Sequence, residues 1–239
     1  MTKAIGNDRV DEDGPGGLGS IIAEFELITR RDYGQFCAIA RAVEAIGERW
    51  GLLIIRDLLV SPKSREQLRR GLPRIPADVL GARLREFERD GIARQRTLPT
   101  GEIRYELTDF GQQLEEIALA LGRWGAQLMD LPRPGEIVTV DAMIFAMRSC
   151  FDAEAGRGVH ASYEINLDDL VFNMVVDDGT VVVEPGPLPT ADLVLRTGPD
   201  MKSLLFGELD PREGIATGAL GVTGDPDLLV LFTKLFHMG

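Results

Sequence analysis

The chain has 239 residues, of which 44% are apolar and 27% charged, a balance typical of folded globular domains. No apolar run approaches the ~18–20 residues needed to span a bilayer. The N-terminal stretch MTKAIGNDRVDEDGPGGLGS is polar and acidic, unlike a signal peptide or an anchor, so we expect a cytoplasmic protein without a membrane partner. The two cysteines and two histidines have no metal-ligand spacing, so we expect no metal and no cofactor. Because no nucleophile is paired with a base, we also expect no enzyme.

The net charge of −12 argues at first against a nucleic-acid partner, but the charge is unevenly distributed along the chain. Residues 131–239 carry 7 basic and 17 acidic side chains, whereas residues 63–104 carry 11 basic and 6 acidic ones. A local basic stripe is the electrostatic mark of a DNA-binding surface, even in an acidic protein. The acidic C-terminal half would repel DNA and is expected to lie away from it.

The first elements in the chain are a polar arm and two helices. Residues 1–19 are glycine-rich and acidic and are expected to be disordered, followed by a short apolar helix over residues 21–28 that is a candidate dimerisation arm. Helical periodicity predicts helices over residues 38–46 and 50–60. The second of these is apolar along one side and is expected to form the floor of a domain.

Residues 64–108 predict two short helices followed by a charged hairpin, the order of a winged helix-turn-helix. Leu68 and Leu72 mark the first helix, Pro73 interrupts it, and Pro76 can open the second because its missing N–H has no helical partner there. The second helix has an apolar face of Val79, Leu80, Leu84 and Phe87. The hairpin pairs residues 92–98 with residues 103–107 across a Pro-Thr-Gly turn. This pattern predicts binding to double-stranded DNA.

Arginines and small residues are the candidate DNA contacts. Arginine bonds guanine bidentately and phosphates strongly, and small residues at a helix N-terminus allow close approach to base edges. The alternative is an ordinary solvated face, in which Glu86, Glu88 and Asp90 pair with the arginines. The candidates on the second helix and the hairpin are Arg74, Pro76, Ala77, Asp78, Gly81, Arg83, Arg85, Arg94, Arg96 and Arg104.

A long amphipathic helix is predicted after the hairpin, with Thr108 as its cap. Its apolar residues recur every three to four positions, at Phe110, Leu114, Ile117, Leu121, Trp124 and Leu128. Two interpretations stay open for this stripe, which is either core or a dimer interface.

Residues 131–135, Leu-Pro-Arg-Pro-Gly, form a stiff break and a predicted domain boundary. Beyond it we expect helices over residues 141–151, 200–207 and 226–236. Strands are expected over residues 158–167, 170–176, 181–184, 191–197 and 219–223, with a tight turn at residues 177–180. The mixture predicts a compact α+β domain, so the fold class of the chain is α+β.

The segment beginning CAIARAVEAIGERWGLLIIRDLL at Cys37 resembles the HxlR-type winged-helix transcriptional regulators. The resemblance is carried by Ile46-Gly47-x-x-Trp50, Leu80-x-x-Arg83-Leu84-x-x-Phe87, Tyr105-x-Leu107-Thr108-x-x-Gly111 and Trp124-Gly125. It implies a homodimer that reads an inverted repeat, with a flexible arm over residues 1–32 and the DNA-binding and dimerisation domain over residues 33–131. The family usually has Arg-Phe where this chain has Ser64-Arg65, so Arg65 is a further DNA-contact candidate on a displaced position. The resemblance also implies a redox-responsive thiol at Cys37. The alternative is that Cys37 is simply a small buried apolar side chain, which is common for cysteine.

Residues 136–239 resemble a sterol-carrier-protein-2-like domain, through Ala191-Asp-Leu-Val-Leu, Leu204-Leu-Phe-Gly-Glu-Leu-Asp-Pro and Gly218-Ala-Leu-Gly-Val-Thr-Gly-Asp. The resemblance implies a pocket for a hydrophobic small molecule or lipid-like ligand. Ordinary core packing is the favoured alternative for any single one of the candidate lining residues, which are Phe145, Phe151, Phe172, Met174, Phe206, Phe232 and Phe236. We therefore expect a dimeric transcriptional regulator modulated by that ligand. The alternative is a carrier or sequestering protein that uses the winged helix only to dimerise.

Overall fold

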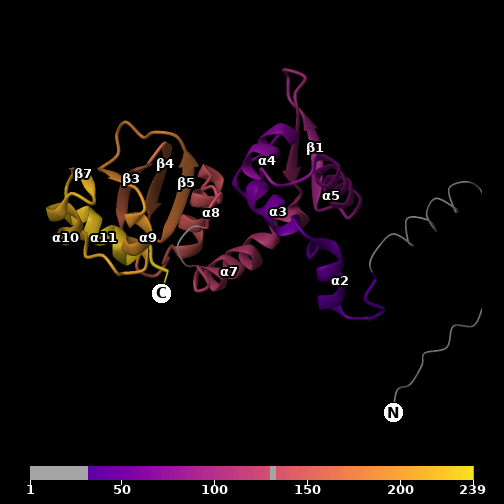
Figure 1. Ribbon diagram of the computed structural model, residues 1–239, viewed down its shortest axis with the longest axis horizontal. Helices are drawn as coiled ribbons and strands as arrows, with labels where there is room; N and C mark the ends of the chain where they lie inside the picture. Colours follow the sequence, from indigo (N-terminus) through magenta and orange to yellow (C-terminus); the bar gives the residue numbers. More distant parts are fainter. Residues whose placement is uncertain (1–31, 130–132, 239) are drawn as a thin grey trace, which may run out of the picture. The chain divides into compact units, whose positions relative to one another are not determined.

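The computed structural model describes residues 32–129 and 133–238, and Figure 1 shows their helices and strands. The chain divides into two compact units, Met1–Glu48 and Arg49–Gly239, and each is described by itself. The disorder expected for residues 1–19 and the helix expected over residues 21–28 lie outside the described residues. The domain boundary at residues 131–135 lies partly outside them and stays a prediction.

The described part of the first unit is built around helix α2, Ala38–Ile46, which confirms the predicted helix. Cys37 occupies its N-cap position with extended backbone, and its side chain makes no capping hydrogen bond. The preceding turn is tied to the helix because the Tyr33 amide donates to Glu44 Oε1 over 3.0 Å. Arg41 pairs with the same carboxylate over 2.8 Å.

The second unit begins with three helices whose apolar faces meet. They are α3 (Gly51–Val60), α4 (Arg65–Gly71) and α5 (Ala77–Arg89). A capping box starts α4, since Ser64 and Gln67 each bond the other's backbone amide, and this arrangement satisfies two amides that lack helical partners. Residues from all three helices are buried together, at Ile54, Ile55, Leu58, Leu68, Leu80, Leu84 and Phe87. Of the apolar face predicted for α5, Leu80, Leu84 and Phe87 are buried and Val79 is half-buried.

A two-stranded antiparallel hairpin follows α5 and confirms the predicted wing. Strand β1 (Ala93–Thr97) pairs with β2 (Ile103–Leu107), and Gly101 in the connecting turn has a φ of 83°, which a glycine adopts without strain. Lys63, between α3 and α4, adds a third short stretch, because it exchanges two backbone hydrogen bonds with Tyr105 of β2.

The prediction of one long helix after the hairpin is wrong in one respect, because the helix is interrupted at Gln113. The structure has a short α6 (Asp109–Gln112) and then α7 (Leu114–Ala126). Thr108 joins the first turn of α6 to the segment before β1. Its hydroxyl accepts a hydrogen bond from the Gly111 amide and donates one to the Gly91 carbonyl. Gly111 lies directly against the Ile92 carbonyl, where no Cβ would fit, so α6 packs closely on the residue that leads into β1.

The rest of the second unit is a five-stranded mixed sheet with helices. The strands are β3 (His160–Leu167), β4 (Leu170–Asp177), β5 (Thr180–Pro185), β6 (Leu193–Thr197) and β7 (Gly221–Gly224), in the order β5-β4-β3-β6-β7. Only the pairing of β3 with β6 is parallel. The predicted turn between β4 and β5 is confirmed, with positive φ at both Asp178 and Gly179, as a tight hairpin of this hand requires.

Four helices accompany this sheet: α8 (Val140–Cys150), α9 (Asp200–Leu205), α10 (Pro211–Thr217) and α11 (Asp227–Leu235). Helix α8 contacts β4 and β5, and α11 contacts β6 (Figure 1). The sequence did not lead us to expect α10, although Asp210 caps it by accepting from the Arg212 and Glu213 amides and Pro211 opens it. The α+β class with a helix-turn-helix part and a small α+β part is confirmed.

Helix α7 has two different faces. On one face it contacts α8 so closely that a Cβ at Gly122 would lie 2.8 Å from Ser149 Oγ. On the other face the predicted apolar stripe is largely open, and Trp124 keeps 62% of its surface exposed. The stripe is thus not core within the described chain, with Phe110, Ile117, Leu121, Trp124 and Leu128 all exposed.

Candidate nucleic-acid interface

The N-terminal end of α5 is the most accessible part of the helix-turn-helix. Pro76, Ala77 and Asp78 are exposed at its start, while Leu80 and Leu84 on the opposite face are buried. The helix therefore stands on its core with its first turn free, which is the presentation that a recognition helix needs. Gly81, by contrast, is buried, although the sequence made it a candidate for a DNA contact.

Gly81 is covered by an arginine from the preceding helix. A Cβ at Gly81 would lie 2.5 Å from Nη2 of Arg65 and 3.4 Å from Nη1 of Arg85. Arg65 thus reaches across from the first residue of α4 to α5, and its guanidinium lies beside that of Arg85. The displaced arginine noted in the sequence is in this way brought to the candidate interface.

The arginines of this region fall into two groups by their partners. Within residues 32–129 and 133–238, neither Arg65 nor Arg85 forms an ion pair with a carboxylate, and both are exposed. Arg83, by contrast, is 2.6 Å from Glu86 Oε2, and only 18% of its side chain is exposed. Part of the solvated-face alternative therefore holds on α5, where Glu86 pairs with one arginine of the two.

The arginines of the wing are held by two glutamates. Glu106 accepts from Arg94 Nε over 2.8 Å and lies 3.5 Å from Arg96 Nη1, while Glu102 pairs with Arg104 over 3.1 Å. The hydrogen bond from Arg94 lowers the pKa of Glu106 below its ordinary value, so this carboxylate stays charged. The wing keeps a net positive charge, and its arginines are oriented in advance.

Arg74, between α4 and α5, donates from Nη2 to the Gly135 carbonyl over 3.1 Å.

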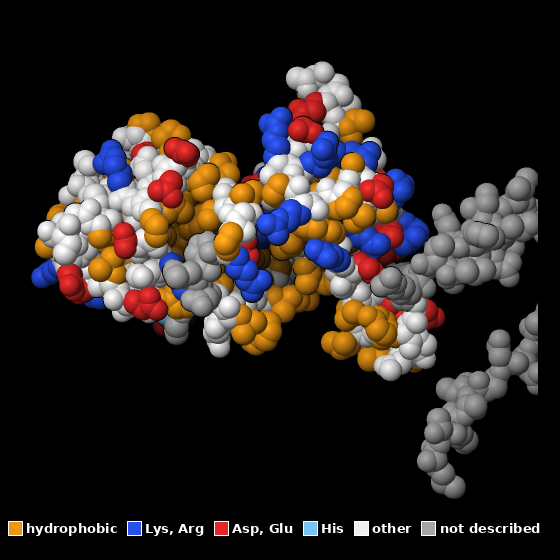
Figure 2. All heavy atoms as spheres, viewed as in Figure 1, with side chains coloured by type: hydrophobic (Ala, Val, Ile, Leu, Met, Phe, Trp, Pro, Cys, Tyr) orange, Lys and Arg blue, Asp and Glu red, His pale blue; other side chains and the backbone are white. Residues whose placement is uncertain are grey.

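Figure 2 shows Lys and Arg side chains gathered over the part of the view that Figure 1 assigns to α4, α5 and β1, with some acidic side chains among them. The candidate DNA contacts all belong to α4, α5, the segment between these helices, and the hairpin, and their role stays a prediction.

The candidate ligand residues are mostly packed against one another. Phe172, Met174, Phe232 and Phe236 have no exposed surface, and Phe145 is buried. The Phe232 and Phe236 rings are stacked at 4.9 Å, and Phe151 lies 5.4 Å from Phe236. Of the seven, Phe206 borders an open pocket. Its volume is about 420 Å³, and its walls come from α9, the start of α10 and the end of α11, among them Leu205, Leu209, Thr233 and His237.

The two cysteines differ in environment. Cys37 is exposed, so the buried alternative weighed for it is wrong, whereas Cys150 is buried in α8. Burial raises the pKa of the Cys150 thiol to about 12, which keeps it protonated and unreactive.

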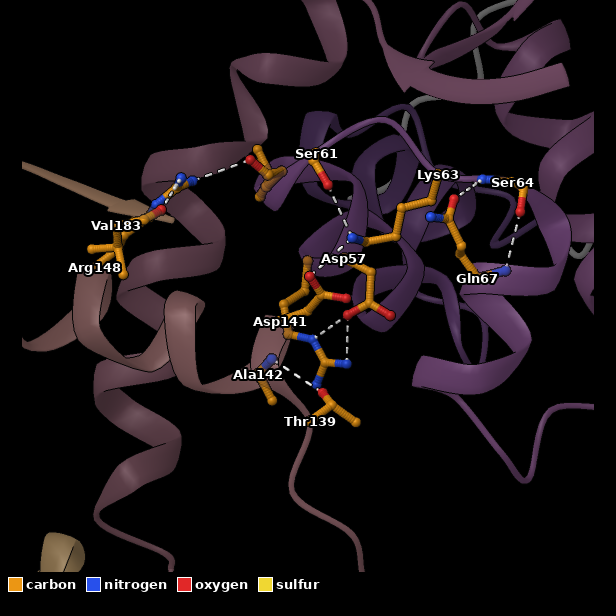
Figure 3. A network of polar contacts seen from close by, with 12 residues as sticks. Asp57, Ser61, Lys63, Ser64, Gln67, Thr139, Asp141, Ala142, Arg148 and Val183 are labelled. Carbon is orange, nitrogen blue, oxygen red and sulfur yellow. Dashed lines mark hydrogen bonds and ion pairs between the residues drawn. The ribbon is translucent and has the colours of Figure 1, made fainter. Parts of the chain in front are cut away.

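A polar network that joins α3, the connection from α3 to α4, and α8 was missed at the level of sequence (Figure 3). Lys63 Nζ lies 2.9 Å from Asp141 Oδ1 and 3.0 Å from Ser61 Oγ. Asp57 is fully buried and accepts twice from Arg56 through Oδ1, while its Oδ2 has no hydrogen-bond partner among the described residues. A lone acidic residue in the apolar stretch 50–60 was the one signal for it, whereas its partner groups lie far along the chain.

No helix among the described residues is long and apolar enough to cross a membrane, and within the same residues no cluster of three or more histidine, cysteine or acidic side chains could hold a metal ion.

Comparison with known proteins agrees with this architecture. Residues 45–132 match the HxlR-like helix-turn-helix family, and residues 150–237 match the SCP-2 sterol transfer family. The uncharacterized HTH-type transcriptional regulator YdeP of Bacillus subtilis is 30% identical over 97 residues, which cover 39% of this chain and 75% of that protein. The HTH-type transcriptional regulator YodB of the same organism is 30% identical over 99 residues, 41% of this chain and 86% of that protein.

A solved structure of the redox regulator HypR in its oxidized form is 30% identical, covers 40% of this chain and 100% of that one, and has a TM-score of 0.38. The family match and the relatives together define a helix-turn-helix transcriptional regulator. The chain belongs to the HxlR-like family and carries an SCP-2 domain after its helix-turn-helix.

Proposed function

We propose that this regulator binds double-stranded DNA as a homodimer, reads an inverted repeat with α5, and is modulated by a hydrophobic small molecule held in its C-terminal part. The single observation that carries the DNA-binding part is the pair of exposed arginines, Arg65 and Arg85, beside Gly81 of α5, a helix whose first residues are also exposed. A guanidinium without a carboxylate partner can bond phosphate or guanine without first breaking an ion pair.

The dimer is supported by the apolar stripe of α7. Ile117, Leu121, Trp124 and Leu128 recur at helical spacing and are all exposed, although α7 packs on α8 through its other face. A continuous exposed apolar stripe of this kind marks a protein interface in ordinary folded proteins. A second copy of the chain is the occupant that an inverted-repeat reader needs, because each copy supplies one recognition helix.

The ligand part is supported by the pocket beside α11. Its volume of about 420 Å³ is within the range of small-molecule sites, and its wall combines apolar side chains with the polar groups of Asp210, Thr233 and His237. We propose residues 33–131 as the DNA-binding and dimerisation domain and residues 136–239 as the ligand-binding domain.

The DNA-binding proposal is tested by selecting duplexes from a random pool with the full chain and measuring gel shifts of the selected sequence. We expect a sequence with dyad symmetry and a shift at low salt; failure to retain any duplex at low salt would overturn the proposal. Arg65→Gln should weaken the shift, whereas Arg69→Gln should change it less, because Arg69 lies on the same helix and already faces Glu66 at 3.6 Å.

The ligand proposal is tested by native mass spectrometry of the purified protein followed by organic extraction. We expect a bound apolar compound that is lost in Leu209→Trp, which fills the pocket, and retained in Val182→Trp, which adds the same side chain on an exposed strand position. A bound compound without any DNA binding would instead support the carrier alternative, and retention of the compound in Leu209→Trp would exclude this pocket.

A further inference from the structure

We propose that Lys63 is a positioning residue for DNA binding, through which helix α8 of the C-terminal part sets the placement of the wing. The inference deepens the proposed function, and the part of it that concerns DNA binding rests on that function. It is built on contacts within the second unit, Arg49–Gly239.

Lys63 is joined to the wing through its backbone. Its amide donates to the Tyr105 carbonyl over 2.9 Å, and the Tyr105 amide donates back over 2.8 Å. Lys63 therefore acts as a strand partner for β2 on the side away from β1. A displacement of Lys63 must move β2 or break these two hydrogen bonds, and both outcomes change the hairpin that carries Arg94, Arg96 and Arg104.

The side chain of Lys63 is joined to α8. The residue is only 6% exposed, and its Nζ donates to Asp141 Oδ1 over 2.9 Å and to Ser61 Oγ over 3.0 Å. Asp141 stands in the first turn of α8, where the helix dipole also favours its negative charge. A buried ammonium without its carboxylate is costly, so Lys63 is expected to follow Asp141 when α8 moves.

Helix α8 is in turn part of the C-terminal core. Ile144 and Met147 have no exposed surface and pack in the cluster that includes Phe172, Phe232 and Phe236. Near the other end of α8, Arg148 donates to the Leu59 carbonyl of α3 over 3.1 Å and to the Val183 carbonyl of β5 over 3.3 Å. Any change in packing inside this core therefore reaches α8, and through α8 it reaches Asp141.

Asp57 supplies a second carboxylate for Lys63. It is fully buried, its Oδ2 is unpartnered among the described residues, and it is close enough to Lys63 and Asp141 to be affected by both charges (Figure 3). If Asp141 withdraws, the Lys63 ammonium has Asp57 as an alternative partner. Two discrete arrangements of one buried side chain are the kind of element that transmits a change between sites.

The test compares Asp141→Asn with Asp200→Asn in the full chain. Both substitutions remove one negative charge from the first turn of a helix in the C-terminal part, but among the described residues only Asp141 has a hydrogen bond to Lys63, the strand partner of the wing. The readouts are amide hydrogen exchange over residues 93–107 and the dissociation constant for the duplex selected by the wild-type protein.

We expect Asp141→Asn to speed exchange in the wing and to weaken DNA binding roughly five-fold or more, the lower end of typical coupling between sites. Charge alone predicts the opposite sign, because removing a negative charge favours DNA, and Asp200→Asn should show only that small gain. Asp141→Glu, which keeps the carboxylate, should restore most of the wild-type behaviour.

Equal behaviour of Asp141→Asn and Asp200→Asn in both readouts would overturn the inference. Should Asp141→Asn unfold the sheet, seen as fast exchange in β3 and β4, Lys63→Met tests the same link from the wing side and should also speed exchange there. If the wild-type chain binds no DNA, the proposed function fails, but the exchange readout still decides whether α8 holds the wing.

Discussion

The division of arginines into paired and unpaired groups makes a sharp prediction for two neighbours on α5. Arg83→Gln and Arg85→Gln remove the same charge from the same helix, two residues apart. Arg83 is already paired with Glu86 at 2.6 Å and is mostly buried, whereas Arg85 is exposed and has no ion pair among the described residues. We expect Arg85→Gln to weaken DNA binding strongly and Arg83→Gln to weaken it little.

The magnitude follows from counterion release. Each phosphate contact contributes about 0.9 to the slope of log affinity against log salt concentration. In a dimer, Arg85→Gln removes one contact from each copy, so the slope should fall by about 1.8. When the salt concentration rises fourfold, from 50 to 200 mM, the affinity of the variant should therefore drop by a factor about twelve times smaller than the factor for the wild-type protein.

Fluorescence anisotropy of a labelled duplex, titrated at a series of salt concentrations, measures both the affinity and the slope. Thermal unfolding serves as a control, because Arg83→Gln also removes an i,i+3 ion pair worth roughly 0.2–0.5 kcal/mol to the helix. The reasoning is refuted if Arg83→Gln lowers the slope as much as Arg85→Gln, or if neither variant changes it.

Three further predictions follow from α7, the cysteines and Asp57. Trp124→Glu should shift the protein from dimer to monomer in sedimentation velocity, since it puts a carboxylate in the apolar stripe, while Gln127→Glu should leave the dimer intact; a dimeric Trp124→Glu protein would exclude this face. One thiol, Cys37, should react with an alkylating reagent in the native protein and Cys150 only after denaturation, and two reactive native thiols would contradict the burial of Cys150. Burial raises the pKa of Asp57 above its ordinary 3.8. The contribution of this group to the free energy of unfolding is therefore highest below pH 3.8 and falls as the pH rises through the raised pKa, because the buried charged form is unfavourable. The gain in unfolding free energy from Asp57→Asn, measured by urea titration, should therefore increase with pH, and a pH-independent difference would contradict it.

The elements that the sequence predicted well are those with a strong local period. The apolar face of α5 and the turn at Asp178-Gly179 depend on neighbours only a few residues apart, and both are confirmed. The break at Gln113 was missed because the apolar period runs through it unbroken, and the close contact of Gly111 with Ile92 just before it is created only by the folded hairpin. The capping pair Asp210-Pro211 was a local signal for α10 that could have been used.

The candidate site was predictable in composition but not in its partners. The basic residues of 63–104 were evident from their charge, and Glu106 opposite Arg94 follows from the hairpin register. The pair of Lys63 with Asp141 joins residues 78 positions apart, and no pattern of charge along the chain distinguishes it from a chance combination. The position of Arg65 over Gly81 depends likewise on how α4 meets α5 in three dimensions.

Gly122 has a consequence for any attempt to build chimeric regulators. A glycine inside a helix costs about 1 kcal/mol relative to alanine, yet here a Cβ would collide with Ser149 of α8. The relatives YdeP and YodB align with only about two fifths of this chain, whereas the contact of α7 with α8 joins the helix-turn-helix part to the SCP-2 part. A chimera that joins this SCP-2 domain to another regulator would therefore require a glycine at the position equivalent to 122. This glycine would lower the stability of the helix but would leave room for Ser149 of α8 to pack against it.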